Sequence, residues 1–558
     1  MPKFLLIDHS LKDLGGHHYP YAYNVLAAAQ RAGWEPVLVT HRSFTQHSAL
    51  PPEWRVHALF HHESYSRYTL DTQATRTAHP SQTTTPGWQR VRNWWSARMR
   101  ARLGDQFARD CARLFTLEPL APTDQVFIAT TSELDLSGLT KFLGCSGTGL
   151  NSDWHLQFHF GIFQGREPDY DLQPGAAASM RSSVIQSLEQ SGKQRLHFYC
   201  TTEQLTTQYQ RLRVATFKTL PYPVHELFRP RAIPGDATAP LRIACLGHSR
   251  REKGYAQLPE IVRALWNEWF APGRAQLVLQ TRHRATRRAL ERLMASLPGG
   301  HDSPQVLDFA EFPLPLAEYA KLLCSADVGL MLYDSTRYYA RCSGVLLEML
   351  CAGVPVLVPA GGWLAEQIEF ENQHYLDQVW SQAPQALPCP ESGAIAISDS
   401  QQSLLISCRW RPNARPGEYL RLEFALQDAT GADQGLAIAI LGPRPGELPV
   451  RTVLRLPAGC ARVRIAMRNA WQRNVAPASD PQWTLLPEAI PMGALGLTVA
   501  AGTEVPRLLQ DVLEHCSHYH AYVAAHAAGC ALAHSGAAVI AGLGAHAGVV
   551  IAEPSATT

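Results

Sequence analysis

The sequence predicts an α/β protein with two parallel-sheet domains and an antiparallel β-sandwich inserted in the second. Two observations predict the parallel sheets: short apolar runs near residues 4 and 241 each end at a glycine-bearing turn that opens a helix. Strands that alternate with helices in this way are typical of βαβ units. A third observation predicts the sandwich, because residues 404–468 hold short alternating strands separated by Gly, Pro, Asn and Asp.

Length and composition set the broad class. A chain of 558 residues, 46% hydrophobic and 18% charged, has room for two or three globular domains with sizeable cores. Its net charge of +2 argues against a nucleic-acid binder. The 12 cysteines and 23 histidines form no CxxC or HExxH pattern, so we expect reduced thiols, no bound metal and a cytoplasmic location. We expect neither a signal peptide nor a membrane-spanning helix.

The first domain is predicted over residues 1–225 and opens with a strand over 4–7, a helix over 21–32 and a strand over 36–40. The turn after the first strand lacks the GxGxxG pattern of dinucleotide sites, but its glycines would let a ligand approach the backbone. Histidines follow directly and are candidates for contact with a substrate; exposed loop histidines are the alternative. These candidate residues are Gly15, Gly16, His17 and His18.

A later strand of this domain, over residues 154–158, ends at His159. Ligands of open α/β sheets bind beyond the carboxyl ends of the strands. His159 is therefore a candidate catalytic residue, and a core histidine with satisfied hydrogen bonds is the alternative.

A basic, tryptophan-bearing segment, residues 88–103, interrupts the first domain. It contains five arginines and three tryptophans without one acidic residue. A helix of this composition suits peripheral contact with an anionic membrane face. The alternative is a solvated helix whose tryptophans pack on the domain.

The second domain is predicted to begin at residue 226, and its first strand, over 241–246, ends in a cationic turn. The turn runs from Gly247 to Gly254 and offers side chains that suit a diphosphate, since guanidinium groups bind phosphate oxygens bidentately. A basic surface loop is the alternative. The cationic side chains are those of Arg250, Arg251 and Lys253.

A polar turn, an apolar helix and a β-branched strand follow one another over residues 338–359. Ser343 or Gly344 caps the helix in this prediction, and the N–H groups near Gly344 and Val345 form an anion site at its N-terminus. The carboxylate of Glu348 can accept hydrogen bonds from the vicinal hydroxyls of a ribose. An ordinary αβ unit with a solvated Glu348 is the alternative.

The predicted domain limits follow from these patterns. The second α/β domain covers residues 226–380, the inserted sandwich 381–492, and the rest of the second domain, with C-terminal helices, 493–558. A surface loop tolerates such an insertion well.

Together these motifs resemble those of GT-B-fold glycosyltransferases, a fold of two Rossmann-like domains. They are similar to the family-4 (glycosyl transferases group 1) enzymes, which use nucleotide-sugar donors. The resemblance covers residues 1–375 and 493–558. The motifs that carry it are the Gly15-Gly16 loop, His159 with Gly165, residues 220–228, the turn 247–254 and residues 343–359.

The resemblance implies an enzyme that moves a sugar, with retention of configuration, from a nucleoside-diphosphate sugar to a saccharide or lipid-linked acceptor in surface-polysaccharide synthesis. It implies no metal ion and no other cofactor. Lys253, with Arg250 or Arg251, would neutralise the leaving diphosphate. Glu348 would hold the ribose, and His159 would contact the transferred sugar. The other implied contacts are Gly15, Gly16, Gly247, Ser343, Gly344 and Val345 to the donor, and His17 and His18 to the acceptor.

Two positions depart from the family pattern. Ala340 stands where the family has a second acidic residue, and His248 stands where it has an arginine. The missing acid keeps open a catalytically degenerate binding or scaffold subunit. A nucleotide-sugar epimerase is a further alternative, because such enzymes also use two domains of this kind.

Overall fold

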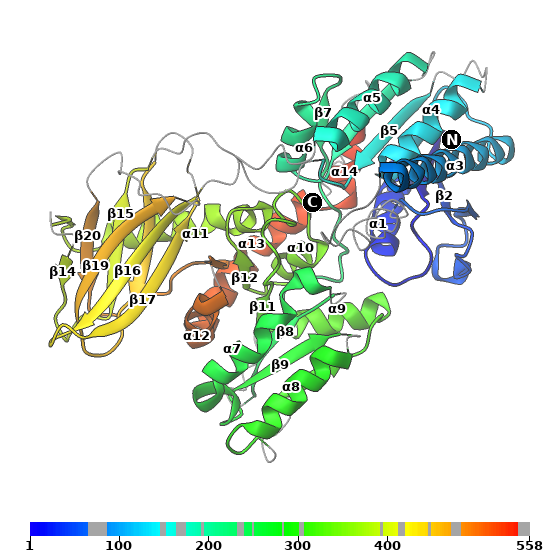
Figure 1. The fold of residues 1–558 in the computed structure, drawn as a ribbon. Helices are drawn as coiled ribbons and strands as arrows, with labels where there is room; N and C mark the ends of the chain where they lie inside the picture. Colours follow the sequence, from blue (N-terminus) through cyan, green and yellow to red (C-terminus); the bar gives the residue numbers. More distant parts are fainter. Residues whose placement is uncertain are drawn as a thin grey trace, which may run out of the picture. The chain divides into compact units, whose positions relative to one another are not determined.

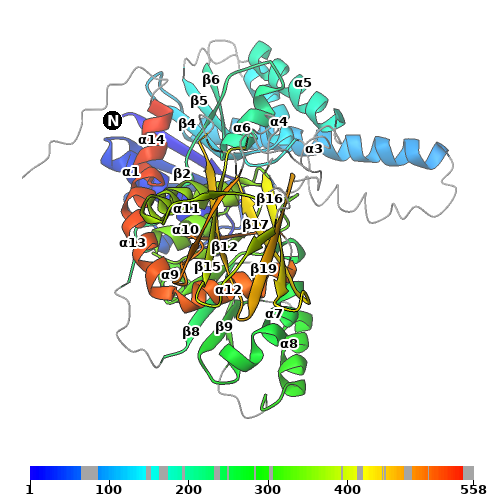
Figure 2. The same cartoon turned by 90° about the vertical axis from the view of Figure 1, so that its left-hand side faces the viewer.

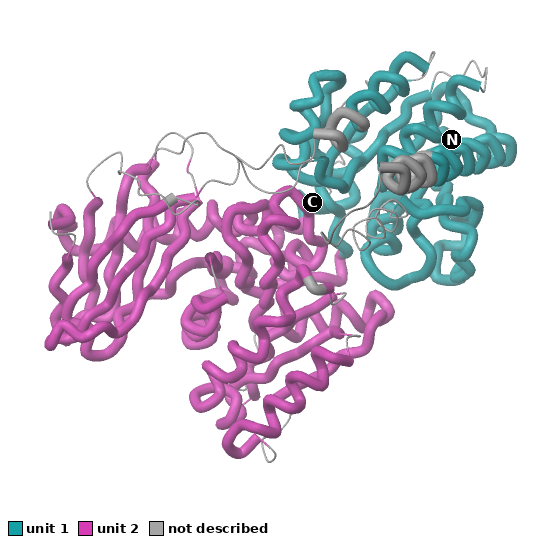
Figure 3. Tube along the Cα trace, in the orientation of Figure 1, with its two compact units in different colours: residues 1–164, 170–225, 532–558 teal, residues 165–169, 226–531 magenta. Residues whose placement is uncertain are grey.

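The computed structural model describes residues 1–64, 86–145, 152–162, 174–190, 195–231, 239–247, 250–281, 284–300, 306–390, 394–410, 419–442, 444, 448–469, 481–500 and 502–544. The chain divides into two compact units (Figure 3): unit 1 comprises residues 1–164, 170–225 and 532–558, and unit 2 comprises residues 165–169 and 226–531.

Unit 1 is built on a seven-stranded sheet in the order β3-β2-β1-β4-β5-β6-β7, and every neighbouring pair is parallel. The central strands are buried along almost their whole length, as their apolar runs predict. The predicted parallel sheet is therefore confirmed. The strand order reverses at β1, so the gap between β1 and β4 is the switch point where such sheets bind ligands. The strands are β1 (Lys3–Asp8), β2 (Glu35–His41), β3 (Arg55–Phe60), β4 (Gln125–Thr131), β5 (Asp153–Phe158), β6 (Arg195–Cys200) and β7 (Phe217–Thr219).

The C-terminal helix α14 (Gly536–Gly544) packs against α1 (His18–Arg31) in unit 1 (Figure 2). A Cβ on Gly536 would lie 2.1 Å from the carbonyl oxygen of Asn24, so only glycine permits this approach. The domain limits predicted from the sequence placed this helix with the second domain, whereas residues 532–558 belong to unit 1. The sequence of α14 is made of small apolar residues, and this local pattern does not indicate that the helix packs against α1. The other main helices of unit 1 are α3 (Pro86–Leu117), α4 (Glu133–Cys145), α5 (Pro174–Gln190) and α6 (Glu203–Gln210).

Unit 2 holds a six-stranded parallel sheet in the order β10-β9-β8-β11-β12-β21. Both parallel sheets thus share the strand order of Rossmann-like domains, and the second has its switch point between β8 and β11. The strands are β8 (Leu241–Cys245), β9 (Ala275–Gln280), β10 (Leu307–Ala310), β11 (Val328–Leu330), β12 (Val356–Pro359) and β21 (Gly496–Val499). The main helices are α7 (Leu258–Ala264), α8 (Arg284–Ser296), α9 (Leu316–Cys324), α10 (Gly344–Cys351), α11 (Trp363–Gln382), α12 (Val505–Glu514) and α13 (Cys516–Ala533).

The chain between α11 and β21 forms two four-stranded antiparallel sheets, ordered β13-β20-β15-β18 and β14-β19-β16-β17 (Figure 1). Alternate residues of β16 are buried, and one hydrophobic cluster contains both Leu404 of β15 and Phe424 of β16. The two sheets therefore share a core. Their strands are β13 (Leu387–Pro388), β14 (Ala394–Ala396), β15 (Ser403–Cys408), β16 (Leu420–Asp428), β17 (Asp433–Leu441), β18 (Val450–Arg455), β19 (Cys460–Asn469) and β20 (Gln482–Leu486).

The end of this antiparallel segment that returns to the parallel sheet is bound by the buried side chain of Asn372 in α11. Its Nδ2 donates a hydrogen bond of 2.9 Å to the carbonyl oxygen of Gly496. Its Oδ1 accepts the N–H groups of Ala494 and Leu495 at 2.8 and 2.9 Å. The chain thus leaves the parallel sheet after β12 and returns in β21, the parallel neighbour of β12.

Candidate functional site

The turn after β8 brings a glycine, a lysine and helix α10 together in unit 2. Gly247 has a φ of +85° and donates its N–H to Oε1 of Gln280 at 2.9 Å. A Cβ at Gly247 would lie 2.8 Å from Nζ of Lys253 and 3.3 Å from Cγ2 of Val345. Three residues predicted for one site therefore meet beside the β8–β11 switch point. The glycine leaves the room that the ammonium group occupies.

Lys253 holds its ammonium group in a largely buried, aromatic setting. Its Nζ lies 5.0 Å from the ring centroid of Tyr333, and that ring lies 4.5 Å from the ring of Tyr338. Burial lowers the pKa of Lys253 from its ordinary value, against the opposing influence of Tyr338 and Glu348. Among the described acidic side chains, none forms an ion pair with Lys253. A buried cation in this state is suited to receive an anion.

Helix α10 begins beside this cation. Oγ of Ser343 accepts the N–H of Leu346 at 3.4 Å, which confirms Ser343 as the predicted cap. The N–H groups of Gly344 and Val345 belong to the first turn, where an α-helix supplies no acceptor. Because Val345 adjoins Gly247, the positive end of the helix dipole and the ammonium group of Lys253 favour an anion at the same place.

Glu348 lies one turn further along α10 and is buried. The hydroxyl of Tyr319 in α9 donates a hydrogen bond of 3.0 Å to its Oε2. Burial raises the pKa of Glu348 to about 7, although Tyr319 and Lys253 both act to lower it. The carboxyl group is therefore fixed in direction and can accept or donate a hydrogen bond near neutral pH. In chemical terms, unit 2 offers an anion site with a carboxyl group next to it that can bind hydroxyls.

Two further cationic residues, Arg250 and Arg251, were predicted for this site. Arg250 is exposed at the surface of the turn, and the side chain of Arg251 lies outside the described part of the chain, as do His248 and Gly165. Ala340, at the position where the sequence departs from the resembled pattern, is buried.

In unit 1, the predicted glycine turn leads into α1. Gly16 has a φ of +80°, His17 is exposed, and the rings of His17 and His18 lie 4.2 Å apart. Nδ1 of His18 is 2.9 Å from Oδ2 of Asp8, the last residue of β1. Asp8 was not among the predicted site residues, although its place at the carboxyl end of a strand was a usable signal.

His159 follows β5, as predicted, and its ring is partly buried near the ring of Tyr21. Nε2 lies 2.7 Å from the carbonyl oxygen of Ala129. Since a carbonyl oxygen only accepts, Nε2 carries the proton and Nδ1 is an acceptor. Burial lowers the pKa of His159 to about 4, so the ring is neutral at pH 7. It can accept a hydrogen bond from a hydroxyl but provides no positive charge.

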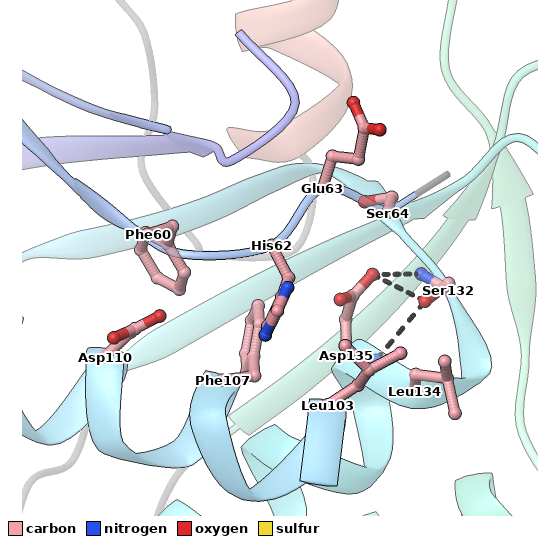
Figure 4. Close-up of a pocket in the computed structure, with 10 residues that line it drawn as sticks. All are labelled: Phe60, His62, Glu63, Ser64, Leu103, Phe107, Asp110, Ser132, Leu134 and Asp135. Carbon is pink, nitrogen blue, oxygen red and sulfur yellow. Dashed lines mark hydrogen bonds between the residues drawn. The ribbon is translucent and has the colours of Figure 1, made fainter. Parts of the chain in front are cut away.

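Unit 1 contains a second histidine–carboxylate pair, formed by His9 and Asp135. Nε2 of the buried His9 is 3.1 Å from Oδ1 of Asp135. The other oxygen of Asp135, Oδ2, accepts the N–H and the Oγ–H of Ser132 at 2.8 and 2.7 Å (Figure 4). Burial opposes charge on His9, but Asp135 raises the pKa of the ring above its ordinary value. The adjoining cavity has a volume of about 10 Å³, which is room for about one water molecule and none for a sugar.

Among the described residues, a group of three potential metal ligands consists of the buried Asp327 and His520 and the partly buried Cys516, with ligand atoms within 4.8 Å of one another. It lies at the amino end of β11, away from the switch point. Arg231 donates a hydrogen bond of 2.5 Å to Oδ1 of Asp327 and so already balances the charge of that carboxylate. The expectation of no metal stays a prediction.

Helices α13 and α14 together, residues Cys516–Gly544, form a stretch long and apolar enough to cross a membrane. Core helices of globular proteins pass the same test, and α13 buries Tyr519, His520 and Val523 within unit 2. The predicted membrane contact through residues 88–103 falls in α3, where the side chains before Arg98 lie outside the described part.

No family model and no curated protein matches the sequence. Solved structures that resemble the chain include glycosyltransferases, as predicted. Trehalose-6-phosphate synthase OtsA is 13% identical, with 65% of this chain and 86% of that chain covered and a TM-score of 0.43. The synthase from Burkholderia multivorans is 11% identical over 66% and 84%, with a TM-score of 0.43. WaaG, a glycosyltransferase involved in lipopolysaccharide biosynthesis, is 15% identical over 65% and 83%, with a TM-score of 0.37.

Proposed function

We propose that the chain is a glycosyltransferase that takes a nucleoside-diphosphate sugar as donor and binds it in unit 2. The observation that carries the proposal is the meeting of Gly247, Lys253, Val345 and Glu348 beside the β8–β11 switch point. A buried ammonium group and a helix N-terminus suit the two phosphates. A carboxyl group one turn along the helix suits the vicinal hydroxyls of the ribose.

The acceptor would be a saccharide or a lipid-linked saccharide bound by unit 1, where His17, His18 and His159 offer hydrogen bonds to hydroxyl groups. We place this activity in the cytoplasm, in the synthesis of surface polysaccharide. Residues 88–103 would contact the membrane face. The two antiparallel sheets would form an inserted sandwich that binds glycan. We expect the donor to bind without a metal ion, since Lys253 and the α10 N-terminus supply the positive charge.

The test is thermal stability of the full chain against uridine, guanosine, adenosine and thymidine diphosphates and their common sugar conjugates. A donor at about a hundred times its dissociation constant adds roughly 2.7 kcal/mol to the free energy of unfolding, which raises the melting temperature. We expect a shift with the nucleotides of one base, in buffer containing EDTA. The shift should vanish in Lys253→Ala and Glu348→Ala.

Matched controls exist on the exposed face of α9. Glu318→Ala and Lys321→Ala remove the same side-chain types at exposed positions and should leave the shift unchanged. If no nucleotide or nucleotide sugar raises the melting temperature, the transferase proposal fails and a binding or scaffold subunit becomes the better account. If the shift in melting temperature persists in Glu348→Ala, the donor does not bind beside α10.

A further inference from the structure

The antiparallel sheet with the strand order β14-β19-β16-β17 is covered by the rest of unit 2 along one edge of its outer face (Figure 1). That edge is β17, whose outward residues Ile438 and Ile440 pack with Ala360 and Ala500. These two alanines follow β12 and β21 of the parallel sheet. The part of the outer face formed by β14, β19 and β16 is called the open half below.

Strand β19 places three arginines on the open half. Val463 is buried in the core that the two antiparallel sheets share. Because successive side chains of a strand point to opposite faces, Arg462, Arg464 and Arg468 point outward. Arg462 and Arg464 are exposed and lie two positions apart, which is about 7 Å along the strand. Since β19 contains no acidic residue, it carries a row of positive charge on its outer side.

One carboxylate already lies between two arginines of the open half. Arg468 is the direct cross-strand partner of Arg421 in β16. Glu423 accepts a hydrogen bond of 2.7 Å from Nε of Arg421 through one oxygen and one of 2.9 Å from Nε of Arg468 through the other. This carboxylate offsets the repulsion between two like charges that face each other across the strands.

Arg462 and Arg464 differ from that pair, because among the described acidic side chains none forms an ion pair with either of them. Their direct cross-strand neighbours are uncharged: Ala394 and Ala425 beside Arg464, and Ala396 and Gln427 beside Arg462. Small neighbours leave the two guanidinium groups accessible. A guanidinium group binds a carboxylate with two parallel N–H bonds, so this position suits carboxylates supplied by a ligand.

The other side chains of the open half indicate which anionic ligand fits. Single-stranded nucleic acids stack their bases on aromatic side chains, and a bilayer is entered by large apolar side chains. Among the described outward residues of β14, β19 and β16, none is aromatic and the apolar ones are all alanine. Gln427 adds a carboxamide that can bind hydroxyl groups. A polymer that offers carboxylates and hydroxyls on an extended chain is an acidic polysaccharide.

We propose that the open half binds an acidic polysaccharide and that Arg462 and Arg464 bind the carboxylates of its sugars. The inference deepens the proposed function, on which it rests, by naming the class of glycan that the inserted sandwich binds. The acceptor of the transfer then belongs to a polymer that contains uronic acids.

The test measures binding of the full chain to immobilised polygalacturonate and to its fully methyl-esterified form, which keeps the backbone and removes the charge. We expect binding to the acidic polymer alone, weaker at high salt because exposed charges are screened. Arg462→Gln combined with Arg464→Gln should lower the affinity about tenfold. Arg288→Gln combined with Arg292→Gln removes the same charge from exposed positions of α8 and should leave the affinity unchanged.

A lysine variant separates carboxylate recognition from net charge. Arg462→Lys combined with Arg464→Lys keeps both charges and loses the planar fork, so its affinity should lie between those of the wild type and the glutamine variant. Wild-type affinity in the lysine variant would overturn the bidentate contact. Double-stranded DNA and phosphatidylglycerol vesicles are the competing ligands, and tighter binding of either one than of polygalacturonate would overturn the choice of a polysaccharide.

Absence of binding to polygalacturonate, equal binding to the esterified polymer, or unchanged affinity in the glutamine variant would overturn the proposal. Because both arginines point outward from the sheet, the glutamine variant should keep the melting temperature of the wild type and its nucleotide-induced shift. Absence of that shift in the wild type would instead remove the transferase, and loss of polygalacturonate binding in the glutamine variant would then describe a binding subunit. The two failures are therefore distinguishable.

Discussion

Tyr319 of α9 donates a 3.0 Å hydrogen bond to the buried carboxyl group of Glu348 in α10. The ring of Tyr319 packs edge-on against Phe228, with 5.9 Å between centroids, so the hydroxyl is held in direction. Burial raises the pKa of Glu348 to about 7, and the hydrogen bond from Tyr319, together with the charge of Lys253, acts to lower it. The first two predictions follow from this contact.

Tyr319→Phe should weaken donor binding while keeping the ring in place. Loss of the hydroxyl removes a contact that lowers the pKa of Glu348, so more of the carboxyl group is protonated at pH 7. We expect a loss of about 1 kcal/mol in nucleotide affinity, or roughly fivefold, measured by titration calorimetry. Tyr375→Phe is the control, because its hydroxyl donates to the Pro491 carbonyl elsewhere in unit 2. Equal nucleotide affinity in wild type and Tyr319→Phe would contradict the positioning role.

Stability should fall as pH rises through the titration of Glu348. The ordinary pKa of 4.5 applies to the unfolded chain, and burial raises the folded value to about 7. Between these values the folded state keeps a proton that the unfolded state has lost, so the free energy of unfolding decreases with pH, and the decrease is complete above 7. The size of the effect is at most about 3 kcal/mol. Urea unfolding at pH 5 and pH 8 should therefore show a smaller difference in Glu348→Gln than in wild type.

Glu369 of α11 titrates in the same window, because burial raises its pKa to about 7 despite the N–H of Gly442. Only the difference between wild type and Glu348→Gln thus reports on Glu348. Affinity for a nucleotide sugar should change in the opposite direction and rise between pH 6 and pH 8, since ribose hydroxyls donate to the ionised carboxylate. Parallel pH profiles of wild type and Glu348→Gln in both measurements would contradict this assignment.

The Lys253 turn should depend on the glycine that ends it. Gly254 has a φ of +76°, and a Cβ there would lie 2.0 Å from the Leu332 carbonyl oxygen. Gly299 has a similar φ of +69° but an added Cβ would meet nothing within 4 Å. Gly299→Ala should cost only the backbone strain, about 1 kcal/mol. Gly254→Ala should cost at least about 2 kcal/mol more, because backbone must move, and should also weaken nucleotide binding. Equal melting temperatures for the two variants would contradict the close approach.

The parts of the fold that were predictable from the sequence are those encoded locally. Residues 4–7 and 154–158 were predicted as buried strands because central parallel strands are apolar on both faces. The first range lies in β1 and the second in β5. Glu348 and Lys253 could be predicted as site residues because a glycine turn that opens a helix is a short local pattern. Residues of this kind can be predicted without knowing which distant parts of the chain pack against them.

The contacts that escaped prediction join positions that no local pattern links. Tyr319 and Glu348 are 29 positions apart, and their meeting depends on how α9 packs beside α10. Asp8 and His18 are only ten positions apart, but the turn between them decides whether the ring comes back to the strand. The packing of α14 against α1 likewise depends on the close approach of Gly536 to the carbonyl oxygen of Asn24, which exists only once both helices have folded.

Asn372 provides the last prediction, because one carboxamide satisfies three backbone groups where the antiparallel segment rejoins the parallel sheet. Asn372→Ala would leave the carbonyl of Gly496 and the N–H groups of Ala494 and Leu495 without their partner in a buried place. Each buried unpaired group costs about 1–3 kcal/mol, so we expect a loss on the order of 3 kcal/mol in urea unfolding. Asn372→Asp keeps an acceptor for both N–H groups, and at low pH its neutral carboxyl group can also donate its O–H to the carbonyl of Gly496. Its loss of stability at low pH should therefore be smaller than that of Asn372→Ala. A loss below about 1 kcal/mol in Asn372→Ala would mean that water or a shifted backbone replaces the carboxamide, and that β21 holds its place beside β12 by strand pairing alone.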